Sequence, residues 1–324
     1  MLARAGAPFL RHRLTRKGRT PMRTGTVTRI KKTIPLYVLL APAVVALFLF
    51  NYIPMYGVII AFQDYSVFKG VMGSDWVGWK HFFYFLHDRT FWVVMKNTLI
   101  INLYDLLFGF TAPIVFALLV SELYQQKFKK LVQTISYLPH FLSWVVVSGI
   151  VIQILSPTEG LFNKLLVWLF QIEPIHFMVK ESAFRSILVL ADIWKGVGWS
   201  AILYFAVIVG IDKTLYEAAW MDGSNRVRQL FHITLPHMMP MIVLLLLLRL
   251  ANMFGIGFER VFLLQNPMVY EVSDVISTYI YRIGLEKAQY SMTTAVGLTQ
   301  SVLGFLLLVA SNRAAKKTVG LGLY

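Results

Sequence analysis

The sequence predicts an all-α integral membrane protein with six transmembrane helices and with both termini in the cytoplasm. Of its 324 residues, 57% are hydrophobic and only 15% are charged, and its mean hydropathy is +0.63. One soluble core cannot bury that much apolar surface. The apolar residues also gather into runs long enough to cross a bilayer, which takes about 20 residues, and the basic residues fall mainly in alternate loops.

Six apolar runs account for the predicted spans. The first run is far longer than the core of a signal peptide and has no small-residue cleavage site, so it is expected to remain as an anchor. An even number of spans returns the chain to the side on which it began. The runs are residues 34–62, 93–120, 132–155, 186–210, 236–254 and 292–311.

The distribution of basic residues predicts the orientation. Nineteen Lys or Arg lie in the four segments assigned to the cytoplasm, nine lie in the three assigned outside, and three lie within spans. Cytoplasmic loops of membrane proteins carry this excess. Orientation therefore explains the net charge of +15 better than nucleic-acid binding does, since no recognised nucleic-acid module is present. No nucleic acid is expected as a partner.

Residues 1–33 form a predicted basic arm on the cytoplasmic side, and residues 34–324 form the predicted transmembrane domain. The first 32 residues carry ten Lys or Arg and no acid. Such an arm either stays solvated or lies on anionic headgroups, where each basic residue contributes about 1 kcal/mol. The sequence leaves both interpretations open.

The predicted outer loops, residues 63–92, 157–185 and 258–290, mix aromatic and acidic residues. Aromatic belts at the headgroup level would account for much of this composition. Docking of an external protein uses the same residue types. Both interpretations remain open.

The longest polar interval late in the chain, residues 212–236, separates two apolar runs and is predicted to be a cytoplasmic loop. Thr214 and Glu217 have the spacing of a capping box, which predicts a helix over residues 215–222. Gly223 can adopt the left-handed conformation that closes such a helix.

A second short helix is predicted over residues 225–233 of this loop. It is expected to lead into Pro236, which is tolerated in the first turn of a following helix. The alternative for the whole interval is an ordinary helix-turn-helix loop between two spans.

The loop residues carry a family resemblance. Glu217-Ala218-Ala219, three further residues, Gly223, nine more and Ile233-Thr234-Leu235-Pro236 reproduce the EAA signature of the permease subunits of binding-protein-dependent ABC importers. More loosely, the resemblance extends from about residue 34 to the C-terminus, and it is closest to importers of oligosaccharides and polysaccharides, acidic alginate-like chains among them. It implies the type I ABC importer architecture, with the loop as a coupling helix docked on a separate ATPase. The residues that it assigns to ATPase coupling are Glu217, Ala218, Ala219, Asp222, Gly223, Ile233, Leu235 and Pro236.

The same resemblance implies the partners and the setting. A second, homologous permease chain would complete the pore within the lipid bilayer of a bacterial inner (cytoplasmic) membrane. Two ABC ATPase subunits would bind beneath the pair, and these subunits would hold ATP and Mg. A periplasmic sugar-binding protein would deliver the oligosaccharide from outside.

The sequence lacks the motifs of an enzyme. It has no G-x-x-x-x-G-K-[ST] phosphate loop, no H-E-x-x-H and no nucleophile elbow. Because there is no cysteine, disulfides, thiolate catalysis and Cys-ligated zinc are excluded. No catalytic residue, metal site or cofactor is therefore predicted for this chain.

The fourth and fifth predicted spans carry polar groups that suggest a substrate path. Charges inside spans are costly and usually face a cavity or a partner. At a rise of about 1.5 Å per residue, these groups fall in the outer half of both spans. Lys195 and Arg249 are expected to attract a carboxylated sugar, and two tryptophans offer flat faces on which sugars stack. The predicted path residues are Asp192, Trp194, Lys195, Trp199, Arg249 and Asn252.

Structural alternatives remain for these charges. Asp192 and Lys195, three apart on one helix, could merely neutralise each other. Arg249 could pair within a subunit interface. In the second span, Asp105 and Lys96 are weaker path candidates, and Lys96 is close enough to the end of the span to snorkel.

Two other functional classes stay open. An ion-coupled secondary sugar transporter could use Asp105 and Asp192, but it normally shows inverted repeats, which are not detected. A membrane-embedded enzyme acting on a lipid-linked sugar would require acids at the membrane surface together with a metal or nucleotide site.

Overall fold

The computed structural model describes residues 26–255 and 257–320, and the chain divides into two units, Met1–Tyr56 and Gly57–Tyr324. Most of the predicted basic arm, residues 1–33, lies outside the described residues. The described part is almost entirely helical, so the predicted all-α class is confirmed.

The first unit contains a single helical rod. Its helix α1 (Thr26–Leu47) continues through a π-helical turn (Phe48–Tyr52) into α2 (Ile53–Met55). Every side chain from residue 34 to residue 56 is exposed, and most of them are apolar. A helix that is apolar on all sides requires lipid or protein around it, which agrees with its prediction as a membrane anchor.

The second unit contributes the other spans. Across the described chain, five stretches are long and apolar enough to cross a membrane, and one bent helix pair makes a sixth candidate. The five stretches are Thr33–Phe62, Arg89–Ser121, Glu181–Val209, Arg226–Ala251 and Tyr290–Lys317. In the second unit they are built from α5 (Arg89–Tyr104), a π turn (Asp105–Gly109), α6 (Thr111–Ser121), α10 (Glu181–Val209), α12 (Arg226–Gln229), a π turn (Leu230–Thr234), α13 (Leu235–Ala251) and α17 (Tyr290–Val319).

The run predicted as one continuous span over residues 132–155 is broken in the structure. Helix α7 (Gln126–Tyr137) and a 3-10 turn (Leu138–Phe141) meet α8 (Trp144–Ile154) at an angle of 106°. The backbone at the break is extended, and the Ser143 hydroxyl accepts from the Val146 N–H at 3.4 Å, so a new helix begins there. Apolar composition alone could not reveal this break.

Short elements complete the second unit. A two-stranded antiparallel ribbon pairs Gln63 with Trp76 and Asp64 with Asp75. These elements are β1 (Gln63–Asp64), α3 (Gly70–Gly73), β2 (Asp75–Trp76), α4 (Lys80–His87), α9 (Leu161–Phe170), α14 (Phe258–Leu264), α15 (Tyr270–Ser273), α16 (Ile276–Ile280), a π turn (Tyr281–Glu286), and 3-10 helices at Tyr56–Phe62, Phe177–Val179 and Pro267–Val269.

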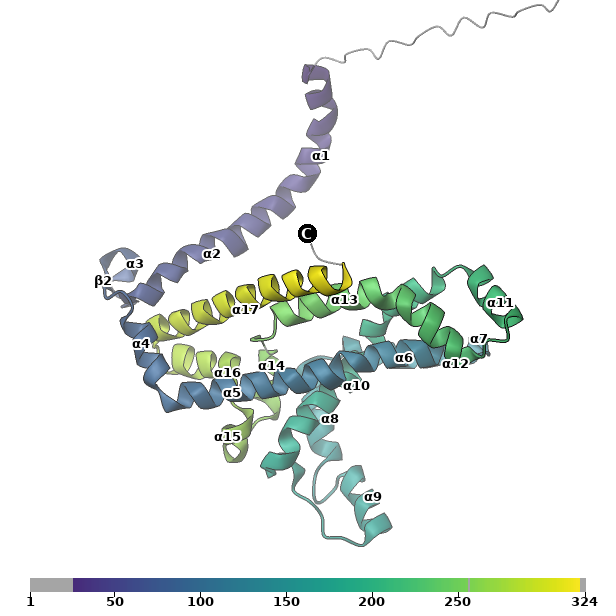
Figure 1. The fold of residues 1–324 in the computed structure, drawn as a ribbon. Helices are drawn as coiled ribbons and strands as arrows, with labels where there is room; N and C mark the ends of the chain where they lie inside the picture. The colour runs from purple at the N-terminus through teal and green to yellow at the C-terminus, as the bar shows by residue number, and fades with distance from the viewer. Residues whose placement is uncertain (1–25, 256, 321–324) are drawn as a thin grey trace, which may run out of the picture. The chain divides into compact units, whose positions relative to one another are not determined.

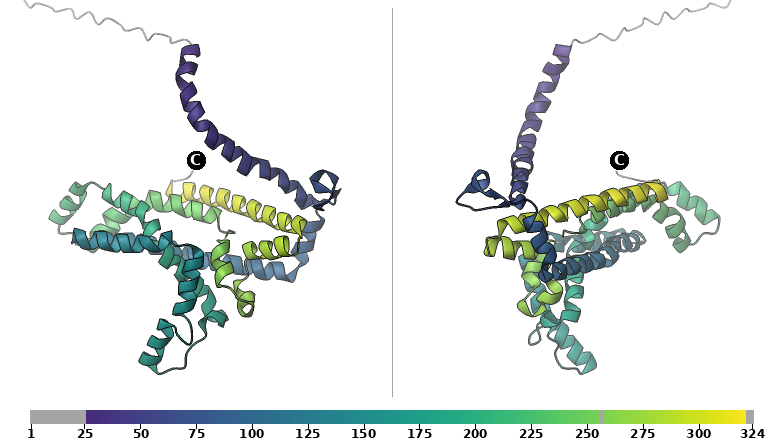
Figure 2. Two further views of the ribbon diagram at one scale, coloured as in Figure 1. Left: turned by 180° about the vertical axis from the view of Figure 1, so that it is seen from behind. Right: turned by 60° about the vertical axis from the view of Figure 1, so that its left-hand side comes forward.

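Helix α10 lies at the centre of the second unit. It packs against α6, α7 and α13, and α13 lies beside α17 (Figure 1). Buried Ala201, Tyr204 and Phe205 of α10 meet Ala117 and Met238 in one apolar cluster. Helices α8 and α9 project away from the layer of long helices in each view (Figure 2). Residues on α10 are therefore positioned by packing on several sides.

The predicted outer loop 258–290 is mostly a folded part of the core. Val261, Val269 and Val275 are fully buried. Hydrogen bonds tie the segment to the middle of α5: the Asn97 amide donates to the Glu271 and Asp274 carbonyls at 2.9 and 3.2 Å. Much of this segment is thus unavailable as a docking surface.

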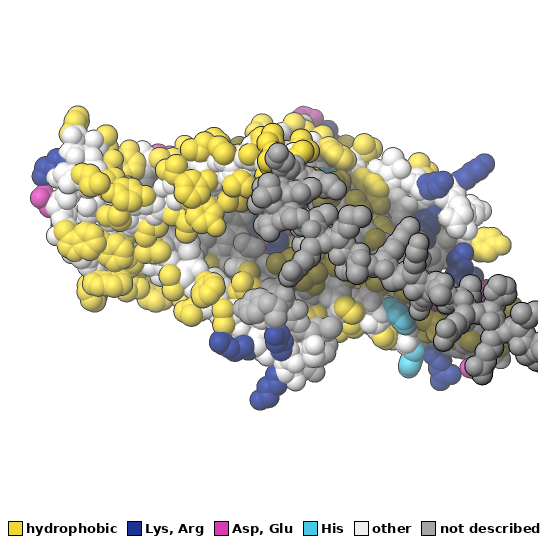
Figure 3. Space-filling model, turned by 90° about the horizontal axis from the view of Figure 1, so that it is seen from above, with side chains coloured by type: hydrophobic (Ala, Val, Ile, Leu, Met, Phe, Trp, Pro, Cys, Tyr) yellow, Lys and Arg dark blue, Asp and Glu magenta, His cyan; other side chains and the backbone are white. Residues whose placement is uncertain are grey.

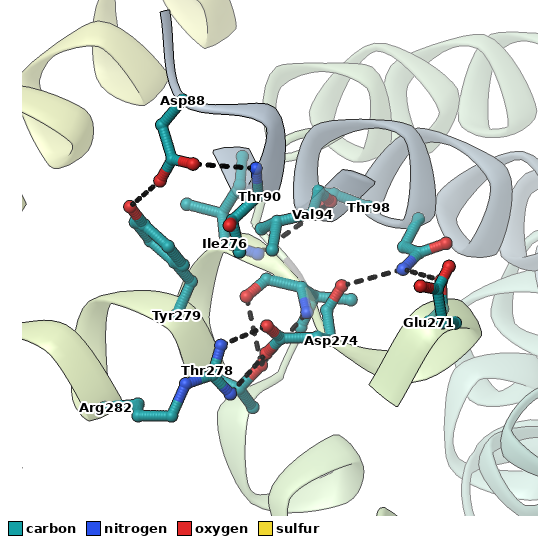
Figure 4. Close-up of polar contacts among 12 residues, drawn as sticks. Asp88, Thr90, Val94, Thr98, Glu271, Asp274, Ile276, Thr278, Tyr279 and Arg282 are labelled. Carbon is teal, nitrogen blue, oxygen red and sulfur yellow. Dashed lines mark hydrogen bonds and ion pairs between the residues drawn. The ribbon is translucent and has the colours of Figure 1, made fainter. Parts of the chain in front are cut away.

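A second group of contacts secures the same segment (Figure 4). The Tyr279 hydroxyl donates to the Asp88 carboxylate at 3.2 Å, and the Ile276 N–H donates to the Thr98 hydroxyl at 3.0 Å. Arg282 forms an ion pair with Asp274. The contacts of Tyr279 and Ile276 thereby hold the segment against α5 and its N-cap, and the ion pair braces the segment internally.

Apolar side chains dominate the surface of the long helices. Hydrophobic atoms cover much of the face seen in Figure 3, and most visible Lys and Arg side chains lie near its margins. On α17, for example, Phe305 is 64% exposed. Such a surface is suited to lipid rather than water.

We expect the close crossing of α10 and α7 to constrain Gly198. A Cβ atom at Gly198 would lie 2.3 Å from the Ser136 carbonyl oxygen. Gly198→Val should therefore destabilise the bundle by about 1–3 kcal/mol, which a thermal melt of the purified protein would detect as a lower Tm.

Gly196 provides the matched control on the same helix, because a Cβ there meets nothing within 4 Å. Gly196→Ala should leave the Tm unchanged or raise it, since Ala favours helix by about 1 kcal/mol over Gly. An equal Tm for wild type and Gly198→Val would contradict the close contact between α10 and α7.

Candidate functional site

A cavity of about 880 Å³ lies beside α10 and α13, and we call it the central cavity. Five of the six predicted path residues line it; Trp194 does not, so its predicted place in the path has no support from the geometry. The five lining residues are Asp192, Lys195, Trp199, Arg249 and Asn252.

Helical spacing explains why these side chains share one cavity. Asp192, Lys195 and Trp199 follow one another by three and four residues on α10, so they occupy one face of that helix. Arg249 and Asn252 are three apart at the end of α13. Trp194 is two positions from Asp192 and therefore points to another side of α10.

The broken helix supplies further groups to the central cavity. The His140 ring, just before the break, stacks on the Trp199 ring with centroids 4.4 Å apart and planes at 2°. The Lys195 ammonium donates to the His140 carbonyl at 2.7 Å and lies 5.8 Å from the centroid of the Trp144 ring. Lys195 thus turns toward the break, and none of the ion pairs among the described residues joins it to Asp192. The two charges still interact at longer range, so their mutual neutralisation stays a prediction.

A network of four charged residues borders the central cavity. The Arg260 guanidinium donates to both carboxylate oxygens of Asp105, at 3.2 and 2.5 Å, and its Nη1 lies 3.2 Å from the Asp192 carboxylate. Arg249 lies 3.5 Å from the same Asp105. The side chains of Asp105 and Arg260 are almost fully buried. Arg249 therefore has its counter-ion within this chain.

These charges leave a positive surplus at the cavity. Two aspartates and two arginines in the network cancel, so Lys195 adds one further positive charge. Its close contacts are with a carbonyl and an aromatic ring, and it acts on Asp192 only at longer range. A surplus positive charge at a cavity raises the local concentration of anions.

The loop 212–236 begins with a helix, α11 (Lys213–Met221), whose cap differs from the prediction. Asp212 is the N-cap, and its carboxylate accepts from the Thr214 N–H at 3.0 Å. This hydrogen bond holds the pKa of Asp212 below its ordinary value. The predicted start at Leu215, with Thr214 and Glu217 as a capping box, is wrong because the helix begins earlier, at Lys213. A carboxylate is a favourable N-cap since it also interacts with the helix dipole.

The turn that closes α11 is as predicted. Gly223 has φ +77°, the left-handed conformation that glycine adopts without strain. Its N–H donates to the Trp220 carbonyl at 3.0 Å, and the Ser224 N–H donates to the Ala219 carbonyl at 2.9 Å. Helix α11 therefore ends in a defined turn.

The second predicted helix of the loop is present but is continuous with the fifth span. Asn225 caps it by accepting from the Arg228 N–H at 2.8 Å. The helix then passes through a π turn, in which the Leu235 N–H donates to the Leu230 carbonyl, directly before Pro236. This shifted pairing accommodates a proline that cannot donate.

The loop presents apolar side chains at its surface. Trp220 and Met221 are 74% and 83% exposed, and Val227 and Phe231 are also exposed. Of the predicted coupling residues, Ala219, Ile233 and Leu235 are half-buried, whereas Glu217, Ala218, Asp222, Gly223 and Pro236 are exposed. Exposed large apolar groups on a polar loop indicate a protein-binding surface.

Residues 109–318 match the family described as binding-protein-dependent transport system inner membrane component. The chain belongs to this family. The match covers the central cavity, the whole of α6 and the whole of loop 212–236. Members are components of transporters rather than enzymes, and the several apolar helices agree with a multi-pass membrane component.

Relatives of this transport component are similar over nearly their whole length. The polygalacturonan/rhamnogalacturonan transport system permease protein YteP of Bacillus subtilis is 44% identical, with 89% of this chain and 90% of that protein covered. Protein LplB of the same organism is 40% identical, with 91% and 92% covered.

Solved structures share the fold of the family member described here. One is a bacterial ABC transporter involved in import of the acidic polysaccharide alginate, with TM-score 0.83, 38% identity, and 90% of this chain and 98% of that chain covered. Another is the alginate ABC transporter in complex with an alginate pentasaccharide-bound periplasmic protein, with TM-score 0.84, 38% identity, and 92% and 99% covered. The type I ABC importer permease fold predicted from the sequence is confirmed.

Sequence reasoning missed Arg260 and underrated Asp105. Arg260 was assigned to an aqueous outer loop, although apolar Phe258, Val261 and Phe262 around it indicate a packed helix. Asp105 begins a π turn, a feature frequent at functional sites, but no sequence pattern marks that turn. Lys96, the other weak candidate, is exposed and does not line the central cavity.

We expect Arg260 to be required for stability of this transport component. Arg260→Gln would leave Asp105 buried without its close counter-ion, which costs about 3–5 kcal/mol. The expected result is a markedly lower Tm in detergent. Arg249→Gln is the control, because the Arg249 side chain is 42% exposed and lies 3.5 Å from Asp105. An equal decrease of Tm in both variants would contradict the role of Arg260 as the main counter-ion of Asp105.

Proposed function

We propose that this chain forms one part of the membrane path of an ATP-driven importer, and that its central cavity accepts an acidic oligosaccharide from an external binding protein. The observation that carries the proposal is the cavity itself, where the surplus cation Lys195 and the exposed Trp199 ring face one space of about 880 Å³. An aromatic face and a cation together match a sugar ring that bears a carboxylate.

The size of the cavity supports a short stretch of sugar chain as its occupant. A volume of about 880 Å³ lies within the range usual for sites that enclose small ligands, roughly 300–1,000 Å³. A longer chain requires a path that one small helical bundle does not enclose. We therefore propose that a second, homologous permease chain completes the pore.

Relatives support the acidic character of the cargo. YteP is named for transport of polygalacturonan and rhamnogalacturonan, and a solved relative is described as importing the acidic polysaccharide alginate. In this chain, the positive charge of Lys195 likewise favours an anionic cargo. Trp199 has one face covered by His140, so its other face is the one proposed to stack on sugar.

The loop 212–236 is proposed to receive energy from two ATPase subunits, which hold the ATP and Mg. Exposed Trp220 and Met221 at the tip of α11 are suited to a groove in such a partner. The EAA residues Glu217, Ala218 and Ala219 lie on the same helix. Closure of the ATPase pair would then move the loop and, through it, the helices around the cavity.

A periplasmic binding protein is proposed to load the cavity from the outside of a bacterial inner membrane. One solved relative is described in complex with a periplasmic protein that carries an alginate pentasaccharide. The family description as an inner membrane component supports the same location. Alternating access between the two faces would complete import.

The proposal is tested by uptake into proteoliposomes that contain the complex with its ATPase and binding protein. ATP-dependent uptake of an oligo-uronate is expected to exceed uptake of the same chain with reduced carboxyls by about tenfold or more, since a charged contact contributes about 1.5–3 kcal/mol. Uptake driven by a proton gradient without ATP would instead favour an ion-coupled secondary transporter.

A second test addresses the loop. Gly223→Val should strain the backbone at φ +77° by at least about 1–2 kcal/mol and reduce co-purification of the ATPase, while the membrane bundle keeps its Tm. Gly223→Asn is the matched control, because Asn tolerates this conformation better. Normal ATPase binding and uptake by Gly223→Val would refute the coupling role.

A further inference from the structure

Asp105 has two arginine partners that differ in distance and in burial. Arg260 donates to both of its carboxylate oxygens, at 3.2 and 2.5 Å, from a side chain that is only 5% exposed. Arg249 lies 3.5 Å from one of these oxygens, beyond the usual range of a good N–H···O bond. Asp105 therefore keeps a bidentate counter-ion if Arg249 turns away.

The second aspartate of the network also has its close partner in Arg260, and it interacts with Arg249 only at longer range. Asp192 lies 3.2 Å from the Nη1 of Arg260. The buried Arg260 guanidinium thus contacts carboxylates from two different spans. This arrangement leaves Arg249 as the arginine of the network whose side chain can change partner at the smallest cost.

Arg249 is also the arginine that faces the central cavity. It lines the cavity and its side chain is 42% exposed, whereas Arg260 does not line it. A guanidinium presents parallel donors that match a carboxylate in two-point fashion. Its present partner, Asp105, is chemically the same group as the carboxylate of a uronate residue.

We propose that Arg249 is a carboxylate-binding residue that exchanges Asp105 for a uronate carboxylate of the transported chain, and that Arg260 permits this exchange by retaining Asp105. This inference rests on the proposed function and specifies the residue that selects the acidic cargo. Because one carboxylate replaces another, Arg249 has a counter-ion both before and after the exchange.

The exchange has a consequence for release. Asp105 competes with the cargo for Arg249, so it weakens binding and returns the guanidinium to the network when the sugar leaves. A transport site requires binding that is favourable enough to admit the substrate and weak enough to release it. Arg260 acts here as a positioning residue, since it acts through Asp105.

The test measures equilibrium binding to the assembled complex in lipid nanodiscs, without binding protein, so that the selectivity of the binding protein does not enter. The probes are an oligo-uronate of defined length and the same oligomer with its carboxyls reduced to alcohols. In Arg249→Gln, affinity for the acidic probe should fall about tenfold or more, while affinity for the reduced probe stays within about twofold. Arg249→Lys should give an intermediate loss because it keeps the charge without the fork.

A double-mutant cycle separates exchange from a general field effect. Asp105→Asn should tighten binding of the acidic probe, and this gain should disappear in the Arg249→Gln background. A gain of equal size in both backgrounds, or an acidic-to-reduced affinity ratio in Arg249→Gln equal to that of wild type, would overturn the exchange.

Failure of the proposed function is recognised separately. If the wild-type complex shows no ATP-dependent uptake of the oligo-uronate, the function and this inference both fail. If uptake is present but Arg249→Gln keeps the wild-type affinity ratio, only the exchange fails. Should Asp105→Asn not assemble, the comparison of Arg249→Gln and Arg249→Lys with wild type still tests whether Arg249 binds the carboxylate, and an unchanged affinity ratio overturns the proposal.

Discussion

The buried contact of Arg260 with Asp105 and Asp192 is the interaction on which the central cavity depends. Its three members come from the π turn after α5, from α10 and from α14, so it joins two spans and a segment that follows a third. A charge buried away from water is tolerated only with close partners. The network therefore determines the relative rotation of the elements whose other side chains line the cavity.

The cavity and the loop 212–236 are mechanically connected by one helix. The stretch Arg226–Ala251 is one helical span from the cap at Asn225 to Arg249 at the cavity, and it includes the π turn before Pro236. At about 1.5 Å per residue, these two ends are roughly 35 Å apart. Under the proposed function, a displacement of the loop would pass along this helix toward the cavity.

Much of the fold could be predicted from the sequence, but the candidate site only in part. Apolar runs identified the spans because length and composition are local properties, and Gly223 was predicted correctly because one residue type favours its conformation. The cap at Asp212 was not predicted because Thr214 offered a competing cap. The break before Trp144 was not predicted because the run around it is apolar throughout much of its length. Helical spacing places Asp192, Lys195 and Trp199 on one face of α10, and Arg249 and Asn252 near each other at the end of α13. The packing of α10 against α13 brings the two sets to one cavity.

The sequence by itself determined that this is a multi-span membrane protein of the permease family, with its signature loop between the fourth and fifth spans. Only the tertiary structure decided which cation meets which carboxylate. Arg260 is 155 residues from Asp105, and Lys195 turns to the His140 carbonyl instead of to Asp192. Such pairings depend on how helices rotate and cross, which packing of the whole bundle determines and local sequence patterns do not.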